Sequence, residues 1–240
     1  MTSAKEVQHF KETDENTYIK KGKNMQRILT VKGTGQIKKA PDQMEINLTL
    51  LSRGKEYAQT MDQAENAISK LEEALEKEGL VPGSLKTSNF SIDTEYESYQ
   101  DEAGRYLQRF VGYLCEHRLT LRQPMDTSLL GRILDTVSRT KVNPRLQVRF
   151  TIADQEGMAK ELLARASKDA LEKATILADA SGVTLGELQR VDYDWREVAY
   201  YSKTDYRIAE ESLGHINEME MTPEDLHVTD TVRFVWEIHS

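Results

Sequence analysis

Cys115 and His117 are the two side chains best suited, by type and spacing, to catalysis or metal binding. They lie in an alternating segment, 111–119, whose period of two is typical of a β-strand, so both should project from one face of a sheet. A thiol beside an imidazole could bind a soft metal ion or serve as a thiolate nucleophile. The competing interpretation is two half-buried residues on a sheet face under a helix. The alternation favours this second interpretation, because Cys115 shares its parity with Tyr113 and Leu119.

Acidic residues offer a second candidate site, since Asp192, Asp194 and Glu197 could meet a divalent cation in a loop. The chain contains 40 acidic residues, however, and clusters of this kind arise by chance at that abundance. No two histidines have the spacing of a helical metal site among the five in the sequence: His9, His117, His215, His227 and His239. We therefore predict no metal ion.

Nucleotide chemistry finds little support in the sequence. Segment 33–35 reads Gly-Thr-Gly, but no third glycine opens a helix after it, so a dinucleotide site is not expected. Neither a phosphate-binding loop nor a hydrolase nucleophile elbow occurs. The formal net charge of −8 argues against a nucleic-acid partner, which would need clustered Lys and Arg. We predict no cofactor and assign no catalytic residues.

Five aromatic residues gather around the start of an irregular segment, 194–226: Tyr193, Trp195, Tyr200, Tyr201 and Tyr206. Long irregular segments in compact domains are commonly functional. Tyr and Trp are also enriched in protein interfaces, because they combine a large apolar area with a polar tip. These side chains could contact a partner, or they could fold over an edge of the domain's own sheet. The sequence leaves both interpretations open.

The rest of the chain alternates between the periods of strands and helices. One-sided alternation predicts strands at about 27–33, ended by Gly33 and Gly35, and at about 44–50, 85–96, 111–122, 146–152 and 228–238, with a polar loop at 97–105. Apolar stripes predict two long helices at about 55–77 and 155–180, and a shorter helix at about 126–139. Strands with one polar face indicate an α+β fold, with mainly antiparallel sheet covered on one face by the helices.

Small residues indicate how the long helices meet their surroundings. The second long helix carries an alanine every fourth residue, which favours tight packing on the sheet or on another helix: Ala166, Ala170, Ala174 and Ala178. Each long helix is followed by the same pattern, Gly-x-x-x-Gly-x-Leu, at 79–85 and at 182–188. Gly79 is expected to close its helix in the left-handed conformation. The two copies could be an internal half-repeat or two independent uses of one turn.

The composition is that of a soluble globular protein, with 38% hydrophobic and 30% charged residues in a chain of 240. Residues 1–25 are charged and lack periodicity, so we expect a disordered arm there and one domain over 26–240. No stretch approaches the roughly 20 apolar residues of a membrane span. The first 25 residues also lack the apolar core of a secretory signal, so the expected location is the cytoplasm.

Several of these segments together resemble the SIMPL-domain family. They are 28–35 with 40–42, then 85–92 with 112–113, and most specifically 164–178 with 182–186. The resemblance covers 27–190 and resumes at 223–238. It implies a bacterial protein of undefined molecular function, in a family of which many members are exported, some are linked to oxidative-stress defence and some assemble into ring-like oligomers. It supplies no catalytic residues.

Two hypotheses follow from the sequence. The first is a non-enzymatic homo-oligomer, in which helix faces and the aromatic segment make the subunit contacts. The second is a small-molecule-binding protein or an enzyme with its site near Tyr113, Cys115 and His117. The absence of active-site motifs and the resemblance favour the first.

Overall fold

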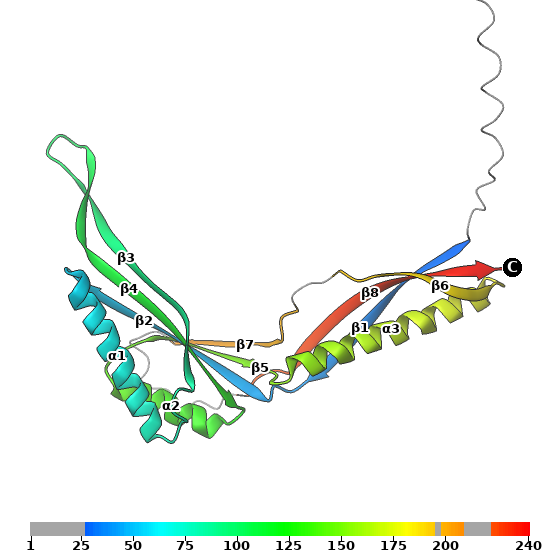
Figure 1. Cartoon of the computed structure of the whole chain (residues 1–240), viewed down its shortest axis with the longest axis horizontal. Helices are drawn as coiled ribbons and strands as arrows, with labels where there is room; N and C mark the ends of the chain where they lie inside the picture. The colour runs from blue at the N-terminus through cyan, green and yellow to red at the C-terminus, as the bar shows by residue number, and fades with distance from the viewer. Residues whose placement is uncertain (1–26, 195–197, 209–221) are drawn as a thin grey trace, which may run out of the picture.

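A computed structural model, which describes residues 27–194, 198–208 and 222–240, shows an α+β protein built on two antiparallel sheets. The molecule is elongated, with the larger sheet and two helices at one end and the smaller sheet and one helix at the other (Figure 1). The predicted fold class is confirmed. The helices are divided between two sheets, each of which has one face covered.

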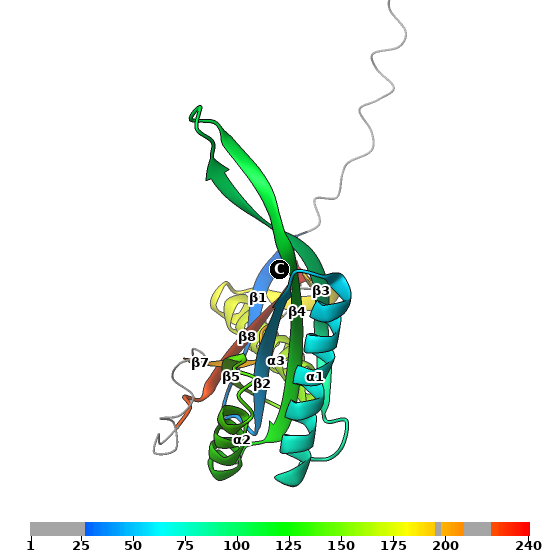
Figure 2. The ribbon, with the colours of Figure 1, turned by 90° about the vertical axis from the view of Figure 1, so that its left-hand side faces the viewer.

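The larger sheet has five strands in the order β3-β4-β2-β5-β7. Its strands are β2 (Gln43–Gly54), β3 (Leu85–Gln100), β4 (Tyr106–Pro124), β5 (Arg145–Thr151) and β7 (Tyr201–Ile208). Helices α1 (Tyr57–Lys77) and α2 (Thr127–Arg139) lie on the same side of this sheet (Figure 2). The core between them is aliphatic and fully buried, as in Met44, Ile46, Leu71, Leu121, Ile133, Val148 and Phe150.

The smaller sheet has three strands in the order β1-β8-β6, and one helix covers it. The strands are β1 (Ile28–Lys39), β8 (Leu226–His239) and β6 (Thr184–Asp192), and the helix is α3 (Gln155–Ala180). Its buried core combines the alanines of α3 with larger residues of the strands: Val31, Val232, Phe234 and Trp236. Large residues on the sheet therefore face small residues on the helix.

The backbone of α3 runs unusually close to β1. A Cβ atom added to Gly33 would lie 2.0 Å from the carbonyl oxygen of Ala166, and one added to Gly35 would lie 2.0 Å from that of Leu162. The prediction that these glycines end the strand is wrong, since β1 continues to Lys39. Their role is to leave room for the helix. The tight packing predicted from the alanine stripe is confirmed.

The two long helices end in the same hydrogen-bonded turn. Gly79 has φ +92° and Gly182 has φ +66°, both in the left-handed region, as expected for Gly79. In each turn the next residue donates back to the helix, from Leu80 N to Leu75 O at 3.2 Å and from Val183 N to Ala178 O at 3.0 Å. The copies then diverge, because the second glycine has a left-handed backbone in the first turn (Gly83) but lies inside β6 in the second.

Two further predictions are wrong, one about the limits of a loop and one about a segment in which no strand was expected. The hairpin β3–β4 continues to Gln100 and resumes at Tyr106, so the predicted polar loop 97–105 shrinks to 101–105. Strand β7 lies within 194–226, where no element was predicted. In both places the sequence lacks the alternation that marks a strand, because the hairpin end is exposed on both faces and β7 directs Ser202 and Thr204 inward.

The predictions of a disordered arm and of no membrane span concern residues that the structure describes only in part. Residues 1–25, predicted as a disordered arm, lie outside the described residues. In the part that is described, no helix is long and apolar enough to cross a membrane.

Replacing Gly35 with alanine tests the close approach of α3. The new methyl group would overlap the Leu162 carbonyl, so we expect a loss of about 1–3 kcal/mol in the free energy of unfolding, measured by urea denaturation. Gly131→Ala is the matched control. Gly131 lies within α2, and no atom lies within 4 Å of the position that its new methyl group would occupy, so the same substitution there should stabilise by about 0.5–1 kcal/mol. Equal effects at the two positions would contradict the close packing.

Candidate functional site

Cys115 and His117 lie side by side on β4, on the face that the core occupies. Cys115 is 1% exposed and His117 is 8% exposed. The Nε2 atom of His117 lies 2.8 Å from the Thr87 hydroxyl oxygen, a hydrogen bond, and the ring packs edge-on against Phe90 at 5.2 Å between centroids. Its Nδ1 atom is buried and has no hydrogen-bond partner among the described residues. The structure thus brings the predicted pair together, but inside the protein.

The electrostatic setting of this pair suits packing better than catalysis. Burial raises the pKa of the Cys115 thiol, which keeps it protonated and weakly nucleophilic. Burial also lowers the pKa of His117, although the nearby Glu72 carboxylate opposes this shift. A protonated thiol and a neutral imidazole are the opposite of an activated ion pair. The structural interpretation of the pair is the one that the geometry favours.

The aromatic side chains of the irregular segment fold onto the protein's own sheets. Tyr206 packs edge-on against Phe150, with 5.9 Å between ring centroids. Tyr201 lies under the Arg149 guanidinium, which is 3.5 Å from the ring centroid. Tyr200 packs against the apolar cluster that joins α3 to β8. Of the two interpretations left open by the sequence, these three support the second, and Trp195 lies outside the described residues.

Of the acidic candidate, Asp192 and Asp194 lie within the described residues, and only Asp192 makes an ion pair there. The Asp192 carboxylate accepts from Arg190 Nε at 3.1 Å. Glu197 lies outside the described residues, as do His9 and His215. Within the described ranges, no three His, Cys, Asp or Glu side chains gather as the ligands of a metal ion would. The prediction of no metal ion stays a prediction.

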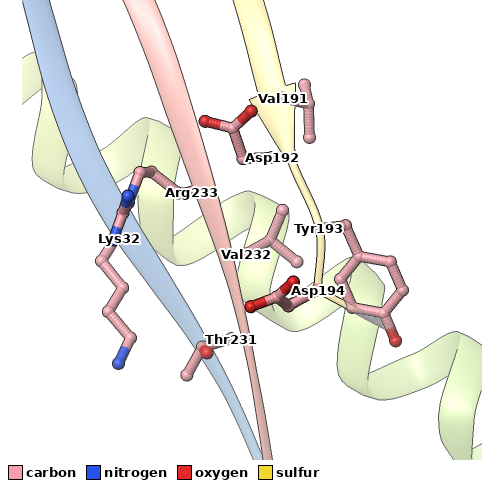
Figure 3. A pocket seen from close by; sticks show the side chains of 8 residues that line it. All are labelled: Lys32, Val191, Asp192, Tyr193, Asp194, Thr231, Val232 and Arg233. Atoms are coloured by element: carbon pink, nitrogen blue, oxygen red, sulfur yellow. The ribbon is translucent and has the colours of Figure 1, made fainter. Parts of the chain in front are cut away.

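A polar groove lies on the uncovered face of the smaller sheet, opposite α3. It has a volume of about 600 Å³ and is lined from all three strands, by Lys32 of β1, by Thr231, Val232 and Arg233 of β8, and by Val191, Asp192, Tyr193 and Asp194 at the end of β6 (Figure 3). The Tyr193 hydroxyl donates to Asp230 at 3.0 Å, which holds its ring on the side of β6 away from the Asp192 and Asp194 carboxylates (Figure 3). Of these residues, the sequence singled out only the three at 192–194.

The end of the β3–β4 hairpin forms a second surface that the sequence did not predict. It projects beyond the first turn of α1 as a two-stranded arm (Figures 1 and 2), which we define as residues 94–112. The arm exposes large apolar side chains: Tyr96, Tyr99, Tyr106, Leu107 and Phe110. Tyr106 is 79% exposed and Tyr96 is 56% exposed, far more than a core-forming ring.

Ring-to-ring contacts connect the arm to the body of the protein. Tyr57, the first residue of α1, meets Tyr113 edge-on at 5.7 Å, Tyr113 meets Phe110 at 5.3 Å, and Phe110 meets Tyr96 at 5.9 Å. Such pairs contribute about 0.5–1.5 kcal/mol each beyond simple burial. Tyr113 is therefore a structural ring at the base of the arm. The closely spaced aromatic residues in 96–113 are the sequence feature from which this surface could have been predicted.

Comparisons with known proteins agree with the resemblance seen in the sequence. A family model described as "SIMPL: Protein of unknown function (DUF541)" matches residues 29–236. The "26 kDa periplasmic immunogenic protein" of Brucella melitensis is 28% identical over 163 residues, which cover 68% of this chain and 65% of that protein. The uncharacterized protein YggE of Edwardsiella ictaluri is 27% identical over 163 residues, covering 67% of this chain and 65% of that protein. The chain thus spans less than two thirds of the length of these relatives.

The buried His117 predicts a specific loss of stability in acid. Its pKa in the folded state lies below the usual 6.5, so below that pH the unfolded chain binds a proton that the folded protein resists. Stability should therefore fall as the pH drops through 6.5, with a slope of at most about 1.4 kcal/mol per pH unit from this group. His117→Gln should reduce the difference in unfolding free energy between pH 7.5 and pH 5.5, measured by urea denaturation.

His227→Gln is the control for that measurement, because His227 is exposed on β8. It should keep the pH dependence of the wild-type protein. An unchanged pH dependence in His117→Gln would show that this imidazole is not held neutral by burial.

Proposed function

This chain belongs to the SIMPL family, and from that premise we propose that it is a non-enzymatic, self-associating protein whose contact surface is the arm. One observation carries the proposal, the exposure of a row of aromatic side chains on a two-stranded ribbon. A two-stranded hairpin is marginally stable by itself in water. Contiguous exposed apolar side chains commonly mark a protein interface. A partner that covers the arm would stabilise the hairpin and bury its exposed apolar side chains.

The edges of the arm also support pairing with another chain. Strand β2 ends at Gly54, opposite Tyr113, so β4 has no described neighbour on that side farther out. Strand β3 is an edge strand of the described sheet along its whole length. Unpaired strand edges present free backbone N–H and C=O groups to a further strand. The arm therefore offers both apolar side chains and a hydrogen-bonding edge.

The charges on the arm favour a second copy of this chain as the partner. Its β3 side carries Glu95 and Glu97, its tip carries Asp101, Glu102 and Arg105, and its β4 side carries Arg109. Within one chain Arg109 pairs with Glu97, and Arg53 with Glu95 at 3.1 Å. A surface that bears both signs can complement its own copy, whereas two chains of net charge −8 would otherwise repel each other.

The two features from which the sequence predicted self-association have other partners. The alanine stripe packs against β1 of the same chain, and the described tyrosines of the irregular segment largely cover its own sheets. The proposal therefore keeps the predicted self-association but assigns the subunit contacts to the arm. Its alternative, a ligand or catalytic site near Tyr113, Cys115 and His117, would need access that the burial of Cys115 and His117 denies.

The cellular role is proposed from the relatives. The Brucella proteins are named periplasmic and immunogenic, and the resemblance links some members of the family to oxidative-stress defence. We extend to this chain a role in stress or envelope-related defence. The cytoplasmic location stays a prediction. Fractionation of cells that express the complete natural gene tests it, since recovery with a cytoplasmic marker supports it and release by osmotic shock contradicts it.

Removing two rings of the arm should abolish association. Because an aromatic hot spot contributes about 2 kcal/mol or more to binding, Tyr96→Ser combined with Phe110→Ser should yield a monomer at concentrations where the wild-type protein assembles. Multi-angle light scattering after size-exclusion chromatography measures the mass directly. Circular dichroism of the double variant should show an intact fold, because neither ring belongs to the core.

Ile176→Ser is the matched control, since Ile176 is also an exposed apolar residue but lies on the outer side of α3. It should assemble as the wild-type protein does. The proposal is wrong if the wild-type protein is a strict monomer over a wide concentration range, or if the double variant assembles equally well.

A further inference from the structure

The groove on the smaller sheet contains an unusual row of charges across three strands. Lys32 of β1 is the direct cross-strand partner of Arg233 of β8, and Arg233 is in turn the partner of Asp192 of β6. Like charges directly opposite each other on one face of a sheet are destabilising. The Lys32–Arg233 pair therefore carries a cost that the fold itself does not explain.

Neither cation of this pair is neutralised within the part of the chain that the structure describes. No carboxylate there lies within ion-pair distance of the Lys32 ammonium or the Arg233 guanidinium. Asp192 is the closest in register, but it pairs with Arg190 at 3.1 Å instead. The two cations thus face the open groove together, a suitable arrangement for a carboxylate, since Arg can bind both oxygens and Lys adds a second charge.

The opposite wall of the groove is acidic. Figure 3 shows the Arg233 side chain over β1, the Lys32 side chain along the outer side of β1, and the carboxylates of Asp192 and Asp194 between β8 and β6. Asp194 makes no ion pair with any described residue, so its carboxylate is available to an ammonium group. Val191 and Tyr193 project from the other side of β6, because Val191 is the cross-strand partner of Phe234 and Tyr193 donates to Asp230 (Figure 3).

We propose that this groove binds a small zwitterion, a short peptide with free termini or an amino acid. Its carboxylate pairs with Arg233 and Lys32, and its ammonium pairs with Asp194. A volume of about 600 Å³ falls within the range of small-molecule sites. The carboxylates would repel a phosphate-rich ligand, and the two cations would repel a metal ion, so a ligand with one charge of each sign fits best.

Ligand-observed saturation-transfer NMR with the full chain tests this proposal, whatever the oligomeric state of the protein. The probes are glycylleucine, its N-acetylated form, its C-terminal amide and free leucine. Glycylleucine should show saturable binding, and each blocked form should bind at least about tenfold more weakly, because each lacks one charge. Free leucine separates the two sources of the zwitterion, since binding equal to that of glycylleucine assigns the site to amino acids, and weaker binding assigns it to peptides.

Arg233→Gln and Asp194→Asn should each weaken glycylleucine binding by about tenfold or more. Arg118→Gln is the control, because it also removes an exposed arginine that lies on the other sheet and pairs with Glu116. The urea midpoint of Arg233→Gln should not fall below that of the wild-type protein, since the variant relieves a like-charge pair. Equal binding of the blocked peptides, unchanged binding by Arg233→Gln, or no saturable binding of any probe would overturn the proposal.

Discussion

A mismatch of length between helix and strand determines the architecture of the larger half. Strand β4 has 19 residues and extends about 60 Å, whereas α1 has 21 residues and extends only about 32 Å. A helix advances about half as far per residue as a strand, so α1 can cover only half of the hairpin. The hairpin residues between Tyr113 and the tip must therefore be covered by something other than α1, or stay exposed to solvent. The arm, its aromatic rings and its open edges all result from this mismatch.

In the smaller half the helix is long enough to cover the strand that it packs on. Helix α3 has 26 residues and extends about 39 Å, which matches the roughly 40 Å of the 12-residue β1. Close contact along this length requires small residues on both sides, and the glycines of β1 and the alanines of α3 provide them. Because the single helix occupies one face only, the other face of the sheet is open. The charged groove lies on that open face.

Local patterns made much of the fold predictable. The helices were predicted within two residues of their observed limits, and the alternation of β2 and β8 identified both strands and their buried faces. The helix-ending turns followed from glycine chemistry alone. Long-range placement was harder to predict. Gly33 and Gly35 looked like strand breakers because a sequence does not show that a helix crosses above them. Strand β7 was not predicted because its first two inward residues, Ser202 and Thr204, are polar, and only Tyr206 and Ile208 pack against the core.

The candidate surfaces were less predictable than the fold for a related reason. Tyr96 and Phe110 are ordinary members of a strand pattern until the helix that should cover them proves too short. Lys32 and Arg233 are 201 positions apart, and only the register of β1 with β8 makes them neighbours. By contrast, Cys115 and His117 were candidates because they are two positions apart in the sequence. The structure shows that this spacing reflects burial of both side chains on one face of a strand. Spacing along the chain shows which residues can meet, whereas helix length and strand register decide which ones remain exposed.

The central claim is that the arm is covered by another copy of the chain, and hydrogen–deuterium exchange of its backbone amides tests this most directly. Exchange is measured by mass spectrometry on peptides from residues 94–112, at a protein concentration that favours association and at one that favours the monomer. We expect slow exchange along the arm in the concentrated sample and fast exchange after dilution, while the core strand β2 is unaffected. Equally fast exchange of the arm at both concentrations, in a protein that is assembled in the concentrated sample, would contradict the claim.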